Sequence, residues 1–340
     1  MTALTRRFLP MLLLLSLLCG MLSSCTKKQT RHTASFYAMD TVISVTLYTP
    51  DADLAERQLA RCRELLAELD GLWSRHTAGS DVWRLNQSAD GLCDLDPRTV
   101  SLLAQAKEIS LATGGAFDPT LAPLSDLWQA CGEQNRLPGA DELAALLALT
   151  GADRLQIGSS ADGTQTAVSR PAGMQIDLGG IGKGAAVTML IEELEVSGIT
   201  GGLVSFGSSV AVFGAKPDGT PFRVALRDPQ DAAGTVGELN LPAGSVLSVS
   251  GDYERYVTSG GQRYHHILDP ETGMPAESGL SSVAVVCTDG ALADALSTAL
   301  FVMGAEASMQ FYETGIYEFE AILIAHDGTI TTTPGLTGFG

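Results

Sequence analysis

The chain has 340 residues, of which 39 are acidic and 21 are basic, so its formal net charge at pH 7 is −18. Nucleic-acid binding needs clustered Lys and Arg to neutralise phosphates, and this charge balance therefore excludes nucleic acid as the expected partner. Hydrophobic residues make up 45% of the chain, which is enough for one large domain or two closely packed halves.

The N-terminal segment predicts export and a lipid anchor. Arg6-Arg7 precede an apolar run from Phe8 to Leu18, and Leu22-Ser23-Ser24-Cys25 follows. The run is too short to span a membrane as a mature helix, and small residues before a cysteine are typical of a lipoprotein signal. We expect residues 1–24 to be a signal peptide and residues 25–35 to be a tether after lipidated Cys25. The protein would then be anchored to the cell membrane on its extracytoplasmic face. A plain cleavable signal with an incidental cysteine is the alternative.

The first half of the body is predicted to be mainly helical after one strand at Asp40–Leu47. Apolar residues recur at helical spacing over Asp51–Leu69. Asp96-Pro97 is typical of an N-cap followed by a first-turn proline, and it predicts a helix that ends near Gly114-Gly115. A further helix is expected at Asp141–Leu149.

The second half alternates short strands with two helices. Helices are expected at Gly184–Glu195 and Ala291–Met303. The predicted strands are Gly202–Phe213, Phe222–Arg227, Ser245–Val249, Ser281–Cys287 and Glu318–Ala325. This mixture lacks regular βαβ alternation, so it predicts an α+β or mixed α/β fold rather than a doubly wound sheet. The cysteines after the signal, at positions 62, 93, 131 and 287, show no C-x-x-C spacing, which argues against zinc and thiol redox chemistry.

A glycine-rich turn at Ile176–Gly184 is the first candidate site. Glycines allow close backbone approach, the following helix begins with partial positive charge, and Lys183 adds a full one, so the turn is suited to a phosphate. The turn departs from the dinucleotide fingerprint because no acidic residue follows at the required distance, and from a P-loop because Asp177 and Gly184 occupy two of its defining positions. A purely structural turn is the alternative.

The second candidate is the helix at Ala291–Met303, whose composition predicts burial on almost every side. Its only polar side chains are Asp294, Ser297 and Thr298, which share one face at helical spacing. Three convergent oxygens suit a hard cation such as Mg²⁺. Alternatively, the hydroxyls bond backbone carbonyls and Asp294 pairs with an arginine.

Two further segments carry candidate groups. The turn at Asp269–Gly273 places His265 and His266 at the end of a strand, where a histidine can accept a proton inside a cleft. In Gly115–Thr120, an aromatic residue next to an acid could hold a flat ring system, although Asp-Pro most often begins a turn or helix. Either segment could be structural instead.

Taken together, the ordered blocks of this chain closely resemble the ApbE-type flavin transferases. The resemblance covers roughly residues 33 to 333. The blocks are Ala38-Met39-Asp40-Thr41, Ser80–Asn86, Phe117–Leu124, Asp177–Gly184, Ser250–Tyr256, His266–Gly273 and Asp294-x-x-Ser297-Thr298. The resemblance implies a single compact α+β domain of the T-fold-like kind, with mixed sheets and packed helices, over residues 36–333.

The resemblance also implies site residues. Mg²⁺ would be held by Asp294, Ser297, Thr298 and the Gly180 carbonyl. FAD would lie against Met39, Trp73, Ala116, Phe117, Asp118, Asp177, Lys183 and Leu268. His266 would be the catalytic base, with His265 beside it.

The implied activity is Mg²⁺-dependent transfer of FMN from FAD to a Ser or Thr hydroxyl of a target protein, with release of AMP. The implied acceptor motif is Asp-x-x-Ser/Thr-Gly-Ala-Ser/Thr, in a protein such as a subunit of a membrane redox complex. Two alternatives remain at this point. Water could replace the protein acceptor, which would make the chain an FAD pyrophosphatase, or the chain could be a non-enzymatic flavin-binding lipoprotein.

Overall fold

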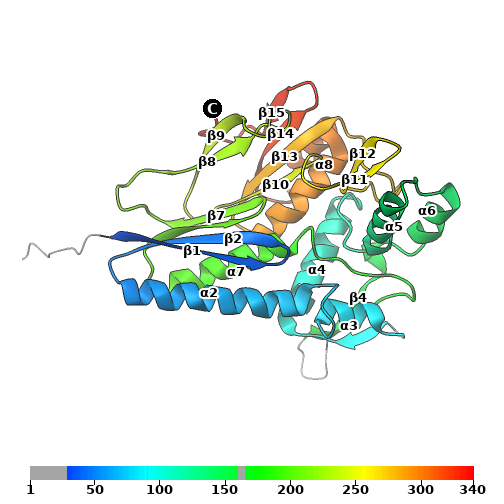
Figure 1. The fold of residues 1–340 in the computed structure, drawn as a ribbon, viewed down its shortest axis with the longest axis horizontal. Helices are drawn as coiled ribbons and strands as arrows, with labels where there is room; N and C mark the ends of the chain where they lie inside the picture. Colours follow the sequence, from blue (N-terminus) through cyan, green and yellow to red (C-terminus); the bar gives the residue numbers. More distant parts are fainter. Residues whose placement is uncertain (1–28, 90, 160–164) are drawn as a thin grey trace, which may run out of the picture.

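An antiparallel sheet of eight strands runs through the middle of the molecule (Figure 1), in the order β1-β2-β6-β7-β10-β13-β14-β15. The computed structural model describes residues 29–89, 91–159 and 165–340. The strands are β1 (Thr30–Ala38), β2 (Thr41–Thr49), β6 (Gly201–Phe206), β7 (Ser209–Gly214), β10 (Val246–Gly251), β13 (Leu280–Cys287), β14 (Glu320–Ala325) and β15 (Ile330–Thr332). Every neighbouring pair is antiparallel, which confirms the α+β prediction and excludes a doubly wound sheet.

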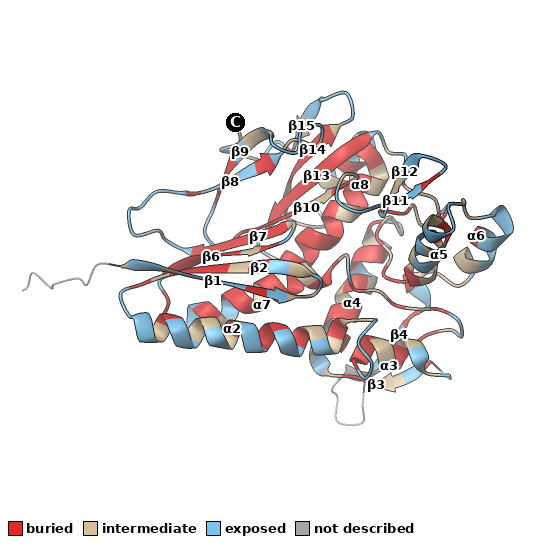
Figure 2. Ribbon diagram, viewed as in Figure 1, coloured by how far each residue is buried: buried red, intermediate tan, exposed pale blue. Residues whose placement is uncertain are grey.

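One face of the sheet is covered by three helices, α2 (Ala52–Trp73), α7 (Gly182–Val196) and α8 (Gly290–Glu313). Asp51 caps α2 by accepting a hydrogen bond from the Leu54 N–H. Helix α8 is red along most of its length in Figure 2, as its apolar composition predicts. Among the described residues it is the one helix long and apolar enough to cross a membrane, and it packs in the core against β10 and β13.

The opposite, outer face of the sheet is covered by a two-stranded hairpin, β8 (Phe222–Arg227) and β9 (Thr235–Leu241). Phe222, Leu226 and Leu239 of this hairpin pack against residues such as Leu247 and Ile322 of the main sheet. Hydrophobic burial therefore holds the hairpin in place. The outer edge of β9 is paired with the last residues of the chain through Glu238–Gly340 and Asn240–Gly338 backbone hydrogen bonds.

The remaining elements lie beside one end of the sheet (Figure 1). They are α3 (Asp81–Gln87), β3 (Leu92–Asp94), α4 (Pro97–Ala112), α5 (Ala122–Glu133), α6 (Ala140–Leu147), η1 (Ala152–Arg154), β4 (Gln156–Ser159), β5 (Gln165–Ser169), β11 (Tyr256–Ser259) and β12 (Gln262–His265). Strands β3, β5 and β4 form one small sheet, and β11 and β12 form another.

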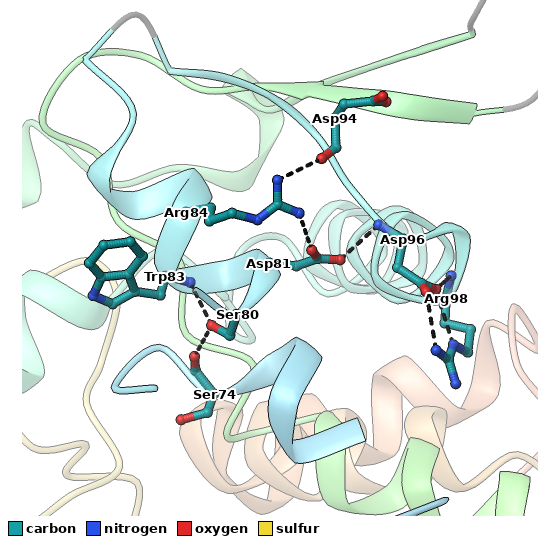
Figure 3. A network of polar contacts seen from close by, with 8 residues as sticks. All are labelled: Ser74, Ser80, Asp81, Trp83, Arg84, Asp94, Asp96 and Arg98. Carbon is teal, nitrogen blue, oxygen red and sulfur yellow. Dashed lines mark hydrogen bonds and ion pairs between the residues drawn. The ribbon is translucent and has the colours of Figure 1, made fainter. Parts of the chain in front are cut away.

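A polar network joins the end of α2, helix α3 and the start of α4 (Figure 3). Ser80 caps α3 by accepting from the Trp83 N–H. The carboxylate of Asp81 is buried, pairs with Arg84 and accepts from the Asp96 N–H at 2.8 Å. A buried carboxylate is stable only when it is paired in this way, so the network fixes how the chain leaves α2.

The expected elements are confirmed with several corrections. The single strand predicted at Gly202–Phe213 is two strands, because Gly207 has φ 61° and reverses the chain between β6 and β7. The helix predicted to end at Met303 does break there, since Gly304 has φ 79°, but helical structure then resumes to Glu313. The tether predicted over residues 25–35 is too long, because Thr30–Ser35 belong to β1 and pair with β2. Cys25 and the signal lie outside the described residues. The four described cysteines are free thiols.

Candidate functional site

Two adjoining cavities, of about 780 and 540 Å³, lie where α7, α5, the β1–β2 turn and the β11–β12 hairpin meet. They share the lining residues Asp40, Ser125, Asp177, Gly179, Lys183, Arg255, His266 and Leu268, so they form one continuous site. Met39 and Trp73 line only the smaller cavity. Ala116, Phe117, Asp118, Gly180, Asp294 and Thr298 line only the larger one. Of the predicted residues within the described chain, Ser297 alone lines neither cavity.

A close crossing of α7 and α8 creates the centre of the larger cavity. A Cβ on Gly184 would lie 1.8 Å from the Gly290 carbonyl oxygen, so only glycine allows the helices to approach this far. The crossing brings Asp294 of α8 to the N-terminal end of α7, where its Oδ2 accepts from the Gly184 N–H at 3.1 Å. The N-terminal end of a helix carries partial positive charge, and its first N–H groups have no partner within the helix. Both features stabilise a carboxylate at this position.

The carboxylate of Asp294 is buried, with 3% of the residue exposed, and each of its oxygens accepts at least one hydrogen bond. Lys183 Nζ lies 3.4 Å from Oδ2, and the Ser248 hydroxyl donates to Oδ1 at 3.1 Å. A lysine therefore offsets the burial of Asp294. The alternative interpretation of the sequence predicted an arginine instead. Ion pairing and these hydrogen bonds together keep a charged group in an otherwise apolar helix.

The two hydroxyls that follow Asp294 on α8 differ in position. Thr298 lines the cavity, whereas Ser297 is fully buried behind it and donates to the Asp294 carbonyl at 2.8 Å. The Ser250 hydroxyl lies 2.8 Å from Ser297 Oγ and 3.2 Å from Thr298 Oγ1, so it connects the two. Within the described part of the chain, no group of three or more His, Cys, Asp or Glu side chains could hold a metal ion.

The glycine-rich turn is held by its own aspartate and by an arginine. Asp177 Oδ1 accepts from the Gly179 N–H at 2.8 Å, and its Oδ2 lies 2.9 Å from Arg75 Nε. Arg75 also pairs with Asp126 of α5 at 2.7 Å. Lys183 donates to the Gly179 carbonyl at 2.8 Å. The turn is therefore fixed from α7 on one side and, through Arg75, from α5 on the other.

Phe117 and Asp118 form a wall of the larger cavity. A Cβ on Gly180 would lie 3.2 Å from the Phe117 ring, so the turn backbone packs directly against that ring. Asp118 accepts from the Thr120 N–H and hydroxyl at 2.8 and 2.6 Å. Burial raises the pKa of the Asp118 carboxyl, and the Thr120 hydrogen bonds oppose that increase. Asp118 thus shapes its own turn and also faces the cavity.

The two neighbouring histidines both line the smaller cavity, but their rings have different surroundings. His265 Nε2 lies 3.1 Å from the Ala276 carbonyl, and its ring packs edge-on against the buried Phe301. His266 lines both cavities, and its Nδ1 lies 3.1 Å from the Arg255 carbonyl oxygen. Because a carbonyl can only accept, Nδ1 carries the proton and Nε2 is left as an acceptor. His266 therefore presents an acceptor nitrogen at the site, and its role as the base stays a prediction.

The electrostatics of His266 favour its neutral form. His266 is exposed toward the cavity, yet the partial loss of water around its ring lowers the ring pKa to about 4. The nearby charges of Arg255 and Lys183 act in the same direction, and the hydrogen bond to the Arg255 carbonyl opposes them. The ring is therefore an unprotonated proton acceptor at neutral pH.

The smaller cavity is bounded by the β1–β2 turn and the end of α2. Met39 and Asp40 form that turn with φ values of 48° and 58°, a left-handed conformation that is uncommon outside glycine. Trp73 ends α2, and its indole N–H is buried without a partner among the described residues. Such a donor next to a cavity is suited to a ligand acceptor.

No sequence pattern assigned a role to Arg75 or Arg255. Arg75 contacts both Asp126 and Asp177, which are distant in sequence, and no local pattern signals that bridge. Arg255 lies within a block that carries the family resemblance, but only the fold shows that its carbonyl orients His266.

Comparison with known proteins decides the family. A sequence model of the ApbE family matches residues 39–323. A FAD:protein FMN transferase of Vibrio cholerae is 32% identical over 268 residues, which cover 78% of each chain. The chain belongs to the ApbE family. A solved ApbE protein from Thermotoga maritima is 30% identical with a TM-score of 0.79, covering 90% of this chain and 97% of that one. The apo flavinyl transferase ApbE of Pseudomonas stutzeri is also 30% identical, with a TM-score of 0.76 and coverages of 90% and 94%.

These matches confirm the ApbE resemblance and the single mixed α and β domain. The range matched to the ApbE family contains every predicted site residue from Met39 to Thr298. Cys25 precedes that range, so the lipid anchor of this ApbE chain stays a prediction.

Proposed function

We propose that this chain transfers FMN from FAD to a Ser or Thr hydroxyl of a protein and releases AMP. Membership of the ApbE family supports the proposal, as do relatives named FAD:protein FMN transferase. The single observation that carries it is the meeting of three groups in one cavity. These are the neutral acceptor nitrogen of His266, the cation of Lys183 and the buried carboxylate of Asp294.

The donors around Asp294 fit Mg²⁺. Asp294, the Thr298 hydroxyl and the backbone at Gly180 line the same cavity, and a Cβ on Gly180 would lie 3.9 Å from Thr298 Oγ1. One carboxylate with neutral oxygens suits an ion that keeps water and substrate phosphate as its other ligands. Ser297 would support the site from behind, through Ser250. When bound, Mg²⁺ would neutralise charge on the phosphoryl group under attack.

The transfer can be written with these residues. The acceptor hydroxyl oxygen attacks the phosphorus of the FMN half of FAD, while His266 Nε2 takes the hydroxyl proton. A new oxygen–phosphorus bond forms, and the pyrophosphate bond to the AMP phosphate breaks. Lys183 lies beside Asp294 and can stabilise negative charge on the phosphates. Phe117, Asp118, Leu268, Met39 and Trp73 would position the rest of FAD.

We further propose that the acceptor is a separate protein with the motif Asp-x-x-Ser/Thr-Gly-Ala-Ser/Thr. This chain contains no copy of that motif, so it should not modify itself. The predicted lipid at Cys25 would restrict the acceptor to proteins exposed on the same side of the membrane, such as a subunit of a membrane redox complex.

The test is covalent labelling. Wild type is incubated with FAD, Mg²⁺ and a soluble protein fragment bearing the motif, and flavin fluorescence is followed in a denaturing gel. We expect a fluorescent fragment and one AMP per flavin attached. Release of AMP without a labelled fragment would favour the pyrophosphatase alternative, and FAD binding without AMP release would favour a flavin-binding module.

A further inference from the structure

The larger cavity extends past the end of the main sheet onto its outer face. Ser248 and Ser250 of β10 point to α8, as their contacts with Asp294 and Ser297 show. Because strand side chains alternate, Leu247 and Val249 point to the opposite face, and both line this cavity. We call this part the outer lobe, lined by Val210, Val224, Leu226, Leu247, Val249, Ala284 and Ile324.

The outer lobe is connected to the part of the cavity that contains His266, Lys183 and Asp294, and the connection passes the loop that follows β10. Tyr253 and Glu254 of that loop line the cavity together with Arg227 at the end of β8. Glu254 interacts electrostatically with Lys183 and Asp294 on one side and with Arg227 on the other. A molecule lying in the outer lobe can therefore extend around this loop to reach the groups near His266.

The wall of the outer lobe is the free edge of a β-strand. In an antiparallel pair, residues that exchange hydrogen bonds alternate with residues whose N–H and C=O point away. Glu238 of β9 bonds Gly340, so its backbone points away from β8. Ala225 lies opposite Glu238, and its N–H and C=O therefore point to the other edge of the hairpin. No described residue pairs with that edge, and Ala225 lines the cavity.

Within the outer lobe, Val210, Val224 and Val249 are partly exposed, whereas the other four lining residues are buried between the hairpin and the sheet. An unpaired strand edge beside these three valines is suited to an extended polypeptide. The edge supplies backbone hydrogen bonds, and the valines receive every second side chain of the added strand. FAD does not match this lobe, because its predicted contacts, from Met39 to Leu268, all line the other part of the site. Besides FAD, the proposed reaction requires one other molecule to approach His266, and that molecule is the acceptor protein.

We propose that an extended segment of the acceptor protein pairs with the free edge of β8 and places its apolar side chains in the outer lobe. The added strand brings the Ser or Thr hydroxyl around the Tyr253–Glu254 loop to His266. This inference rests on the proposed transfer of FMN to a protein, and it assigns recognition of the acceptor to β8.

The test replaces Ala225 with proline. Ala225→Pro removes the outward N–H and leaves the β8–β9 hydrogen bonds in place, since proline is tolerated on edge strands. With the motif-bearing fragment as substrate, we expect the KM for the fragment to rise about five-fold or more, consistent with loss of one backbone hydrogen bond and a steric clash. FAD affinity should stay at the wild-type value.

A matched control places proline in the same hairpin away from the edge. Ala232 follows Asp231 in a turn closed by the Gly234 N–H and the Asp231 carbonyl, which is a position that favours proline. Ala232→Pro should keep the wild-type KM for the fragment. An unchanged KM in Ala225→Pro would overturn the proposal.

Hydrogen exchange of wild type gives an independent reading. The fragment should slow exchange in the peptide that contains residues 222–227, and FAD alone should not. Protection by FAD alone would show that flavin nucleotide occupies the outer lobe, and absence of protection by the fragment would also overturn the proposal. Failure of wild type to label the fragment concerns the proposed transfer instead, and the exchange measurement still decides where the fragment binds.

Discussion

His265 and His266 are adjacent in sequence, but the strand ending at His265 sends their rings to different environments. His266→Ala should retain FAD and Mg²⁺ binding and lose about 10² to 10⁴ in the rate of labelling, the usual contribution of a positioned base. The matched control is His265→Gln, which should keep the rate and lower the free energy of unfolding by about 1 kcal/mol through the lost contact with Phe301. Labelling kinetics and urea denaturation measure both. A fully active His266→Ala would discard this residue as the base.

The environment of His266 also predicts how the transfer rate depends on pH in acid solution. Its pKa is lowered to about 4, mainly by burial, so the ring stays neutral as the pH falls from 7 to 5. We therefore expect protonation of His266 to leave kcat/KM for FAD unchanged over that range. The value of kcat/KM should fall only nearer pH 4, where the ring gains a proton. A pH profile of wild-type labelling checks this. A fall near pH 6.5, absent in His266→Ala, would show instead that the ring titrates like a hydrated histidine.

Asp294 provides the test of the metal. Asp294→Asn keeps the size of the side chain and removes the negative charge that Mg²⁺ requires. Mg²⁺-dependent release of AMP should be abolished, with only a modest change in flavin binding, because predicted FAD contacts such as Met39 and Trp73 line the smaller cavity, which Asp294 does not. A titration of Mg²⁺ against AMP release, with EDTA as the zero point, measures the loss. Equal activity of wild type in EDTA would remove the metal from the mechanism.

At the scale of elements, the close crossing of α7 and α8 predicts that a larger residue at Gly184 destabilises the fold. Gly184→Ala would place a methyl group 1.8 Å from the Gly290 carbonyl oxygen, so the helices must separate. We expect a loss of about 3 kcal/mol in the free energy of unfolding, at the upper end for overpacking. Gly71→Ala in α2 is the control, since nothing lies within 4 Å of its added Cβ. It should stabilise the protein by about 0.5 to 1 kcal/mol. Urea denaturation curves of both variants provide the comparison.

Elements with strong local signals were predictable from the sequence, and those that depend on distant partners were not. The Asp96-Pro97 start and the part of α8 before Gly304 were correctly predicted because capping and periodicity are local. The short strands β3, β11 and β12 were missed because each is stabilised by pairing with another strand. In the site, the residue types were predictable, but the bridge formed by Arg75 required the fold.

At the scale of the whole molecule, the predicted anchor sets where the enzyme meets its acceptor. Cys25→Ala should move the protein from the membrane fraction to the soluble fraction while labelling of a soluble fragment continues at the wild-type rate, because Cys25 precedes the folded domain. Fractionation followed by immunoblotting measures the distribution. Retention of the variant in membranes would argue against a lipid at this cysteine.

The strand order of the main sheet also bears on how the protein is made. From β1 to β15, each strand pairs with the strand of this sheet that precedes it in the chain. During synthesis, every newly emerged strand therefore meets an edge that is already in place, and no later strand has to be inserted between two earlier ones. The longest interval falls between β2 and β6, while α2 through α7 are produced. The nascent chain can thus extend its sheet in a single direction, which limits the time for which unpaired edges are exposed to other chains.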